Sequence, residues 1–289
     1  MSFHVVAFNR SIYSSMRISA LSVFKSTTVL LGVLPICMLV GCNTFDSAPR
    51  GAKSLFQVFT PTTSPTQAAE MATDQYSAEN RYEGTTLLSN ADFGGEGVYI
   101  ELYIDGATDP DAGVRSAAVR ALGRHGDPEH VGLIVDALSD EDVKVRIEAA
   151  RALQRVHSST AVKPLINAMT ESEESNVDVR SSAADALGQY RVNEVVQALI
   201  SGLQDSRLVV NNRVQHSLLM LTGQNFGLDR SAWIDWYNQT DNLFAGAQPY
   251  TYPVFNRKKR LIEYLPLIPP PPNESTSTPV GMDPVTDEI

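Results

Sequence analysis

Apolar residues in the middle of the chain recur every three to four positions, in two patterns that alternate between residues 97 and 240. In the first pattern they occupy positions i, i+4, i+7 and i+8, and in the second positions i, i+3, i+4 and i+7. Examples are Val114, Ala118, Ala121 and Leu122 for the first pattern and Val131, Ile134, Val135 and Leu138 for the second. Each spacing gathers its residues on one face of an α-helix. The middle of the chain is therefore predicted to form successive pairs of amphipathic helices.

The helix pairs repeat at a nearly constant period. Equivalent first-helix residues lie 31, 34 and 31 positions apart, at Val114, Val145, Val179 and Val210. The three extra residues fall in a loop over residues 171–176, and half a repeat precedes the array near residue 97. Periods of this length are typical of solenoids, in which each unit buries its apolar face against its neighbours. The predicted fold class is all-α, a short α-solenoid of helix pairs over residues 97–240.

Local signals predict where several helices begin and end. The pairs Asp109-Pro110 and Asp127-Pro128 suit helix starts, with Asp as the N-cap and Pro at the first helical position. Gly123 and Gly188 suit helix ends.

An aromatic helix is predicted to close the array. Trp233, Trp236 and Tyr237 lie at positions i, i+3 and i+4, after a loop that contains Phe226. A solenoid has to cover its last apolar face, and indole rings bury a large area. We interpret this segment as a capping helix, with an aromatic ligand pocket around Phe226 and the two tryptophans as the alternative.

The segments on either side of the array have the composition of linkers. Residues 42–96 are rich in Ser, Thr, Pro, Gly and Asn and are interpreted as a flexible linker with one helix over residues 67–82. Residues 241–289 contain four consecutive prolines and are interpreted as an extended, largely solvated Pro-rich tail. The basic residues Arg257 to Arg260 in this tail either stay hydrated beside packed apolar residues or contact anionic headgroups or an acidic partner.

The repeated motifs resemble a known family of repeats. Val114-Arg115 and Ala121-Leu122-Gly123, which recur with variations, resemble the HEAT-like repeats first described in phycobilisome lyases. The resemblance covers residues 97–240, somewhat under half of the chain. It implies a helical solenoid, but the family includes bilin lyases, iron-dependent hydroxylases and many scaffolds, so it leaves the activity open.

The N-terminal segment is predicted to be a signal peptide. Residues 1–41 carry Arg10, Arg17 and Lys25 and no acidic residue, and they end in an apolar run of about 14 residues. A membrane-spanning helix needs about 20 apolar residues, so a permanent span is the weaker interpretation. The run ends in Leu39-Val40-Gly41-Cys42, which resembles the lipobox of bacterial lipoproteins. The resemblance implies cleavage before Cys42 and attachment of acyl chains such as palmitate to this cysteine.

These signals predict an exported protein that is anchored to a cell membrane by the lipid on Cys42. Asn43 stands where many inner-membrane lipoproteins have Asp, which favours the outer membrane in a cell that has one. Residues 16–42 also form a complete signal peptide, so the start of translation at Met1 or Met16 is left open.

Charge and cysteine content narrow the function classes. The chain has 23 Lys and Arg against 33 Asp and Glu, a net charge of −10, which becomes −13 when residues 1–41 and their three cations are removed. Nucleic-acid binding needs clustered cations, so a nucleic-acid partner is excluded. Cys37 and Cys42 are the only cysteines. Lipidation of Cys42 would leave the mature chain without a thiol for catalysis or redox chemistry.

Catalytic and metal-binding groups are sparse. The cluster from His125 to His130 could touch a metal ion, but Asp127 within it is already explained as an N-cap. Hydroxylases with HEAT-type repeats use His-Glu pairs, whereas this chain has only Glu129-His130 in reverse order. We predict no catalytic residue, no metal site and no cofactor, and hence a protein that is not an enzyme.

One arginine recurs in each of three repeats, as Arg115, Arg146 and Arg180. These residues could form an anion-binding ladder, but ion pairs with aspartates of adjacent turns, such as Asp142 and Asp178, would explain them equally well.

A binding surface is predicted on the second helices, which line the concave side in stacked helical pairs. Its candidate residues are the non-core positions Asp136, Lys163, Asn167, Gln197 and Ser201. This mixed polar set suits a protein or peptide partner and is poor in groups for acid–base chemistry. The sequence favours a membrane-anchored, protein-binding scaffold. The alternative is a lyase-like or metal-dependent enzyme, or a carrier of a chromophore or cofactor, on the same fold.

Overall fold

The computed structural model describes residues 63–254, 258–264 and 275–282. The chain divides into two compact units, one of residues 1–62 and 259–271 and the other of residues 63–258 and 272–289. In the first unit the described residues include the short 3-10 helix η6 (Leu261–Tyr264). The described residues of the second unit form eleven α-helices, α2 to α12, and no β-strand.

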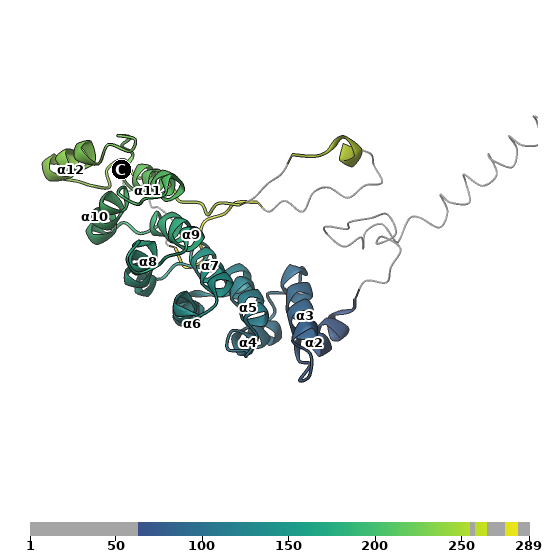
Figure 1. Ribbon diagram of the computed structural model, residues 1–289. Helices are drawn as coiled ribbons and strands as arrows, with labels where there is room; N and C mark the ends of the chain where they lie inside the picture. Colours follow the sequence, from purple (N-terminus) through teal and green to yellow (C-terminus); the bar gives the residue numbers. More distant parts are fainter. Residues whose placement is uncertain (1–62, 255–257, 265–274, 283–289) are drawn as a thin grey trace, which may run out of the picture. The chain divides into compact units, whose positions relative to one another are not determined.

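Helices α3 to α12 form successive pairs that stack into two rows, as Figure 1 shows. The first helices of the pairs are α3 (Ala78–Asn90), α5 (Ala112–His125), α7 (Val143–Ala152), α9 (Val177–Leu187) and α11 (Leu208–Thr222). The second helices are α4 (Gly97–Gly106), α6 (Val131–Asp136), α8 (Val162–Met169), α10 (Asn193–Gly202) and α12 (Arg230–Gln239). Helix α2 (Pro65–Ala72) packs on α3, and the 3-10 turns η3 (Pro128–His130), η4 (Ala137–Ser139) and η5 (Ser159–Ala161) adjoin α6 and α8. The all-α solenoid predicted from the sequence is confirmed.

The core follows the predicted repeat register. The four valines that mark the period are each at most 1% exposed: Val114, Val145, Val179 and Val210. In the second helices, Ile134, Leu165 and Leu199 are fully buried. The loop between α8 and α9 contains the three extra residues, as expected.

Polar residues determine where the first helices begin. The side chains of Asp111, Asp142 and Asn176 accept hydrogen bonds from backbone amides in the first turns of α5, α7 and α9. These N-caps satisfy donors that a helix start leaves unpaired. The prediction that Asp109 caps α5 is wrong, because its carboxylate pairs with Arg81 instead. Asp127 is the N-cap of η3, as predicted.

Gly123 does not end a helix, contrary to the prediction, because α5 continues to His125. A Cβ atom on Gly123 would lie 2.6 Å from Ala152 Cα. Glycine at this position therefore allows α5 and α7 to approach closely. Gly188 is the C-cap of α9, as predicted.

The array begins earlier than the sequence suggested. The interpretation of residues 42–96 as linker is wrong for residues 65–90, where α2 and α3 form, and the segment expected to hold one helix contains parts of both. Leu88 of α3 is fully buried in the core, and α3 packs against α4 and α5. The half repeat expected near residue 97 is therefore the second helix of a complete pair.

Helix α12 ends the array, in agreement with the capping interpretation. Trp233 is fully buried, and its ring meets Phe226 edge-on at a centroid distance of 4.9 Å. Its indole N–H donates to the carbonyl oxygen of Gly227 at 3.0 Å. Packing and hydrogen bonding together account for the aromatic residues of this segment.

Two described runs of the C-terminal tail, residues 246–254 and 275–282, make contacts at the ends of first helices. We call residues 246–254 and 275–282 the C-terminal strap. Gln248 donates its backbone amide to the carbonyl oxygen of Met220 at the end of α11, and Tyr250 is only 4% exposed. Val280 forms a parallel β-bridge with Val156, beyond the end of α7. Most of these residues are exposed, as expected for a solvated tail, but one aromatic ring is buried and some backbone groups bond to the array.

None of the helices in the described ranges combines the length and apolar character needed to cross a membrane. The predicted signal peptide, Cys42 and residues 43–62 lie outside the described residues.

Candidate functional site

Four arginines of the first helices make the same contact with the following repeat. In each, Nε lies 2.6–2.7 Å from a carboxylate oxygen, in the pairs Arg81–Asp109, Arg115–Asp140, Arg146–Glu174 and Arg180–Asp205. Nη2 of each arginine donates to the other oxygen of the same carboxylate. These bidentate pairs, here called the arginine ladder, are the strong form of this interaction.

The other donors of the ladder are also occupied. Nη1 of Arg115, Arg146 and Arg180 donates to two carbonyl oxygens in the turn before its own helix. Each carboxylate also accepts the backbone amide two residues after it. The ladder therefore connects the turn before each first helix to the preceding repeat. In these three arginines, Nε, Nη1 and Nη2 all donate hydrogen bonds within the fold.

The structure supports the ion-pair interpretation of the recurring arginines but corrects their partners. Asp142 caps α7 and Asp178 is exposed in the first turn of α9. The partners are instead acidic residues two positions before each helix cap. In α11, Asn211 stands at the position that arginine occupies in the earlier repeats. Its side-chain amide donates to the carbonyl oxygen of Asp205 at 3.1 Å.

The ladder shifts the protonation of its carboxyl groups. The hydrogen bond from Arg115 lowers the pKa of Asp140 below its usual value, against the opposing effect of burial. Burial raises the pKa of Glu174, but hydrogen bonds from Arg146 and the Asn176 amide outweigh it, and the net pKa is lowered. The stabilisation from these pairs is complete above the usual carboxyl pKa of about 4 and is lost as the pH falls through the lowered values.

The histidines of the cluster from His125 to His130 point to separate partners. His125 Nε2 lies 2.8 Å from the carbonyl oxygen of Ser89, and its ring stacks on Tyr103. His130 Nδ1 accepts the backbone amide of Asp127 at 2.9 Å. Across the described ranges, no group of three or more His, Cys, Asp or Glu side chains is arranged to hold a metal ion.

A buried polar cluster that the sequence did not indicate lies beneath the C-terminal strap. Burial raises the pKa of Asp185 to about 6, although Arg213 Nη1 at 3.5 Å opposes the shift. The hydroxyl groups of Tyr190 and Tyr250 are buried without a hydrogen-bond partner. Asp185 lies inside a repeat motif, and Tyr250 comes near it only when the strap is folded onto the array. The sequence around either residue therefore does not predict the cluster.

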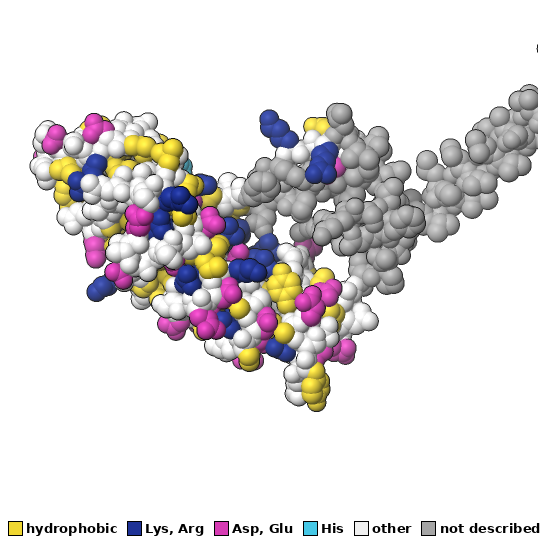
Figure 2. All heavy atoms as spheres, viewed as in Figure 1, with side chains coloured by type: hydrophobic (Ala, Val, Ile, Leu, Met, Phe, Trp, Pro, Cys, Tyr) yellow, Lys and Arg dark blue, Asp and Glu magenta, His cyan; other side chains and the backbone are white. Residues whose placement is uncertain are grey.

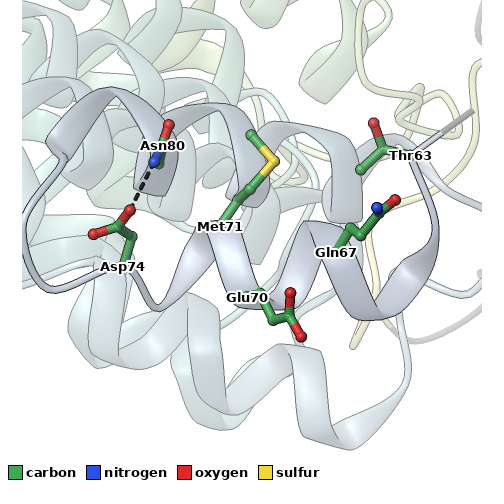
Figure 3. A pocket seen from close by; sticks show the side chains of 6 residues that line it. All are labelled: Thr63, Gln67, Glu70, Met71, Asp74 and Asn80. Carbon is green, nitrogen blue, oxygen red and sulfur yellow. Dashed lines mark hydrogen bonds between the residues drawn. The ribbon is translucent and has the colours of Figure 1, made fainter.

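An open depression lies beside α2, as Figure 3 shows. It is lined by Thr63, Gln67, Glu70, Met71, Asp74 and Asn80. The Asp74 carboxylate accepts hydrogen bonds from the Asn80 side chain and from two backbone amides of the following turn, and the Asn80 bond lowers its pKa. The Asp74 carboxylate thus stabilises the turn between α2 and α3. The residues that line the depression do not form a set of acid and base groups.

The five predicted binding residues are all exposed on successive second helices. Asp136 ends α6, Lys163 and Asn167 lie on α8, and Gln197 and Ser201 lie on α10. Lys163 and Gln197 occupy equivalent repeat positions, and Asp136, Asn167 and Ser201 occupy another. Residues four apart share one side of a helix. We call this stripe the second-helix face.

Some groups on the second-helix face also have partners in the fold. Gln197 Nε2 donates to Tyr237 Oη at 2.7 Å, and Ser201 Oγ donates to the backbone carbonyl of Gln197. Val135 and Ile166, at equivalent positions beside the stripe, are half-buried. Polar groups next to accessible apolar side chains are typical of protein–protein interfaces. Basic and acidic side chains are mixed over the surface seen in Figure 2.

The basic tail residues are only partly described. Lys258, Lys259 and Arg260 are exposed, and the Lys259 ammonium lies 5.9 Å from the centre of the Tyr264 ring. Arg257 and residues 265–274 lie outside the described ranges.

Comparison with known proteins identifies the repeats. A family model described as HEAT repeats matches residues 100–177 and 135–219. Among solved structures, the chain is similar to the YibA protein of Escherichia coli, with 18% identity and a TM-score of 0.45, over 71% of this chain and 77% of that chain. It is also similar to the complex of CpcE and CpcF of phycocyanin lyase from Nostoc sp. PCC7120, with 18% identity and a TM-score of 0.40, over 53% of this chain and 96% of that chain. No curated protein sequence matches it.

Proposed function

We propose that the protein is a membrane-anchored lipoprotein whose HEAT-repeat solenoid binds another protein through the second-helix face. The observation that carries this proposal is the repetition of equivalent exposed polar positions on α6, α8 and α10, beside half-buried apolar residues. A stack of repeats extends such a surface over several helices, which suits an elongated protein or peptide partner.

The chemistry of the other clusters supports a binding role over catalysis. The ladder arginines pair with carboxylates, and His125 and His130 bond to backbone groups. General acid–base catalysis needs a proton-transfer group within reach of a substrate. The second-helix face offers one amine, one carboxylate, two amides and a hydroxyl on separate turns, which suits recognition.

Charge reversal on the second-helix face tests the proposal. The double variant Asp136→Lys with Lys163→Glu keeps the net charge but inverts its local pattern. We expect it to reduce crosslinks to the partner by about tenfold or more, because misplaced like charges are costly at an interface. In-cell crosslinking followed by mass spectrometry measures the change.

A matched control places the same reversal on the other row of helices. Lys144→Glu with Asp178→Lys alters two exposed residues of α7 and α9 and should leave the partner list unchanged. Both variants should keep the helical circular dichroism and melting temperature of the wild type. Identical crosslinks for all three proteins would remove the assignment to this face. Turnover of a substrate, or a chromophore in the absorption spectrum, would instead favour the enzyme or carrier alternative.

The membrane anchor is tested separately at Cys42. Two or three acyl chains anchor a protein stably, whereas one gives only marginal binding. Cys42→Ala is therefore expected to leave an uncleaved or soluble form, while Cys37→Ala, five residues earlier in the predicted signal peptide, should behave as wild type. Membrane fractionation and mass spectrometry of the N-terminus give the readout. If Cys42→Ala stays in the membrane with the same N-terminus as wild type, the lipid anchor is excluded.

A further inference from the structure

Residues 275–282 of the C-terminal strap lie against the array in the manner of a bound peptide. Val280 donates its amide to the carbonyl oxygen of Arg155 and accepts the amide of His157, each at 2.8 Å. These two bonds form a parallel β-bridge between Val280 and Val156. Extended peptides bind the backbone of a host protein through the same hydrogen-bond pattern.

Two neighbouring residues define the shape of the contact. Pro279 is buried, whereas Val280 is 47% exposed. Gly281 has a φ of 82°, a conformation that favours glycine. A Cβ atom at this position would overlap Pro128 Cγ, in the turn after α5. The contact therefore requires a buried proline, a residue that exposes its side chain, and a glycine, in that order.

The slot itself is built by the array. His157 lies between two partners: its ring stacks on Tyr190 at 4.7 Å, and Nδ1 bonds to the side chain of Gln189 at 2.9 Å. Gln189 in turn donates to the carbonyl oxygen of Leu153. These contacts involve only residues of α7, α9 and the turns after them, so the array can hold the amide of His157 in place without the strap.

The two runs of the strap differ in how firmly they are held. The first run buries Tyr250 and places Tyr252 under the guanidinium group of Arg155. The second run makes two backbone hydrogen bonds to the array and buries one proline. It also pairs with the first run, because the Thr276 hydroxyl donates to the Tyr252 carbonyl oxygen and the Tyr252 amide donates to the Ser277 carbonyl oxygen. A short segment with so few contacts is held mainly by the effective concentration that its tether provides.

We propose that the ends of α5 and α7 form a binding site for an extended peptide in which a proline and a glycine flank one residue with an exposed side chain, and that residues 275–282 are its exchangeable ligand within the same chain. This site lies apart from the second-helix face and does not depend on the function proposed for it. A partner with such a segment would compete with the chain's own C-terminal residues.

Release of the second run is the first step of the test. In the full-length chain, Gly281→Val adds a Cβ that overlaps Pro128 and disfavours the required φ. We expect hydrogen exchange of the His157 amide to accelerate by about tenfold or more, because it loses its acceptor and opens locally. The control Thr278→Val, at an exposed position of the same run, should exchange as wild type. Unchanged exchange in Gly281→Val would overturn the proposal.

Replacement of the ligand in trans is the second step. A synthetic peptide with the sequence of residues 275–282, added to the Gly281→Val chain at about 1 mM, matches the effective concentration of a short tether. We expect it to restore slow exchange at His157, and the same peptide with Gly281→Val to fail. Failure of the wild-type peptide, or equal protection by both peptides, would show that the contact is not a specific peptide site.

The amide of Leu153, which donates to Ala149 within the array, reports whether the fold is intact. Its exchange rate should not change in Gly281→Val. If it accelerates, Val280→Pro is used instead, because it removes the amide that donates to Arg155 without adding bulk against Pro128. If both variants unfold the array, residues 275–282 are an integral part of the fold, and the proposal of an exchangeable ligand is rejected.

Discussion

Arg180→Ala is expected to lower the free energy of unfolding of the solenoid by about 3–5 kcal/mol, the cost of leaving a buried charge without its partner. The side chains of Arg180 and Asp205 are only 2% and 3% exposed, the most buried pair of the arginine ladder. Arg180 also donates to the carbonyl oxygens of Glu174 and Ser175, so the turn before α9 loses two further bonds. Urea unfolding followed by circular dichroism measures the loss.

Two further variants separate charge from geometry. Arg180→Lys keeps the cation but lacks the planar fork that binds both carboxylate oxygens, so it should lose an intermediate amount. Arg180→Met with Asp205→Asn removes both charges and retains an acceptor for the Arg207 amide, so it should be more stable than Arg180→Met alone.

The control for the ladder is an ion pair on the surface. Arg151 is 55% exposed and pairs with Glu148 three residues earlier in α7. Exposed pairs contribute about 0–1 kcal/mol, so Arg151→Ala should have little effect. If Arg180→Ala and Arg151→Ala destabilise the protein equally, the ladder is not a structural element of the solenoid.

The ladder also shows how far the sequence can predict this fold. Arg115, Arg146 and Arg180 are visible as repeats, but their partners depend on how one repeat stacks on the next. Glu174 illustrates the difficulty, since it takes the place of aspartate within the irregular loop before α9. A pairing rule drawn from neighbouring sequence positions therefore selects helix caps, such as Asp142, in place of the true partners.

The sequence predicts only the start of helix α3, within the helix expected over residues 67–82, because the composition of α3 is that of a linker, although its spacing is that of a repeat. Arg81 precedes Leu88 by seven positions, as Arg115 precedes Leu122, and Arg81 lies 34 residues before Arg115. Gly84 and Thr85 stand where α5 has Ala118 and Val119, which obscures the apolar stripe. The arginine–leucine spacing was the available signal.

The C-terminal strap could not be predicted in the same way. Val280 pairs with Val156, far away in the sequence, and a single bridge has no period to detect. Asp185 and Tyr250 likewise come together only when the strap closes over α9. Solenoid repeats contact their neighbours along the chain, so their pattern is local, whereas the strap depends on contacts across several repeats.

The second large effect is expected at Leu153, which follows the last residue of α7 and is fully buried in the core of the array. Leu153→Ala removes apolar surface from packing and leaves a cavity, at a cost of about 2–5 kcal/mol. The loss should be large because α7 packs against both α5 and α9, so the cavity weakens the contacts of a central repeat on both sides. Urea unfolding followed by circular dichroism and by tryptophan fluorescence, which reports on α12, measures the stability of the array.

Two variants set the scale for this result. Leu153→Met keeps most of the volume and should cost less than about 1.5 kcal/mol. Lys144→Ala changes an exposed side chain on the same helix, and it should stay within about 0.5 kcal/mol of wild type. If Leu153→Ala were as mild as Lys144→Ala, residue 153 could not lie in the seam between α5, α7 and α9. The same repeat register assigns Leu153 to the core and the second-helix face to the solvent-exposed side of α6, α8 and α10. The assignment of the second-helix face would then have to be revised as well.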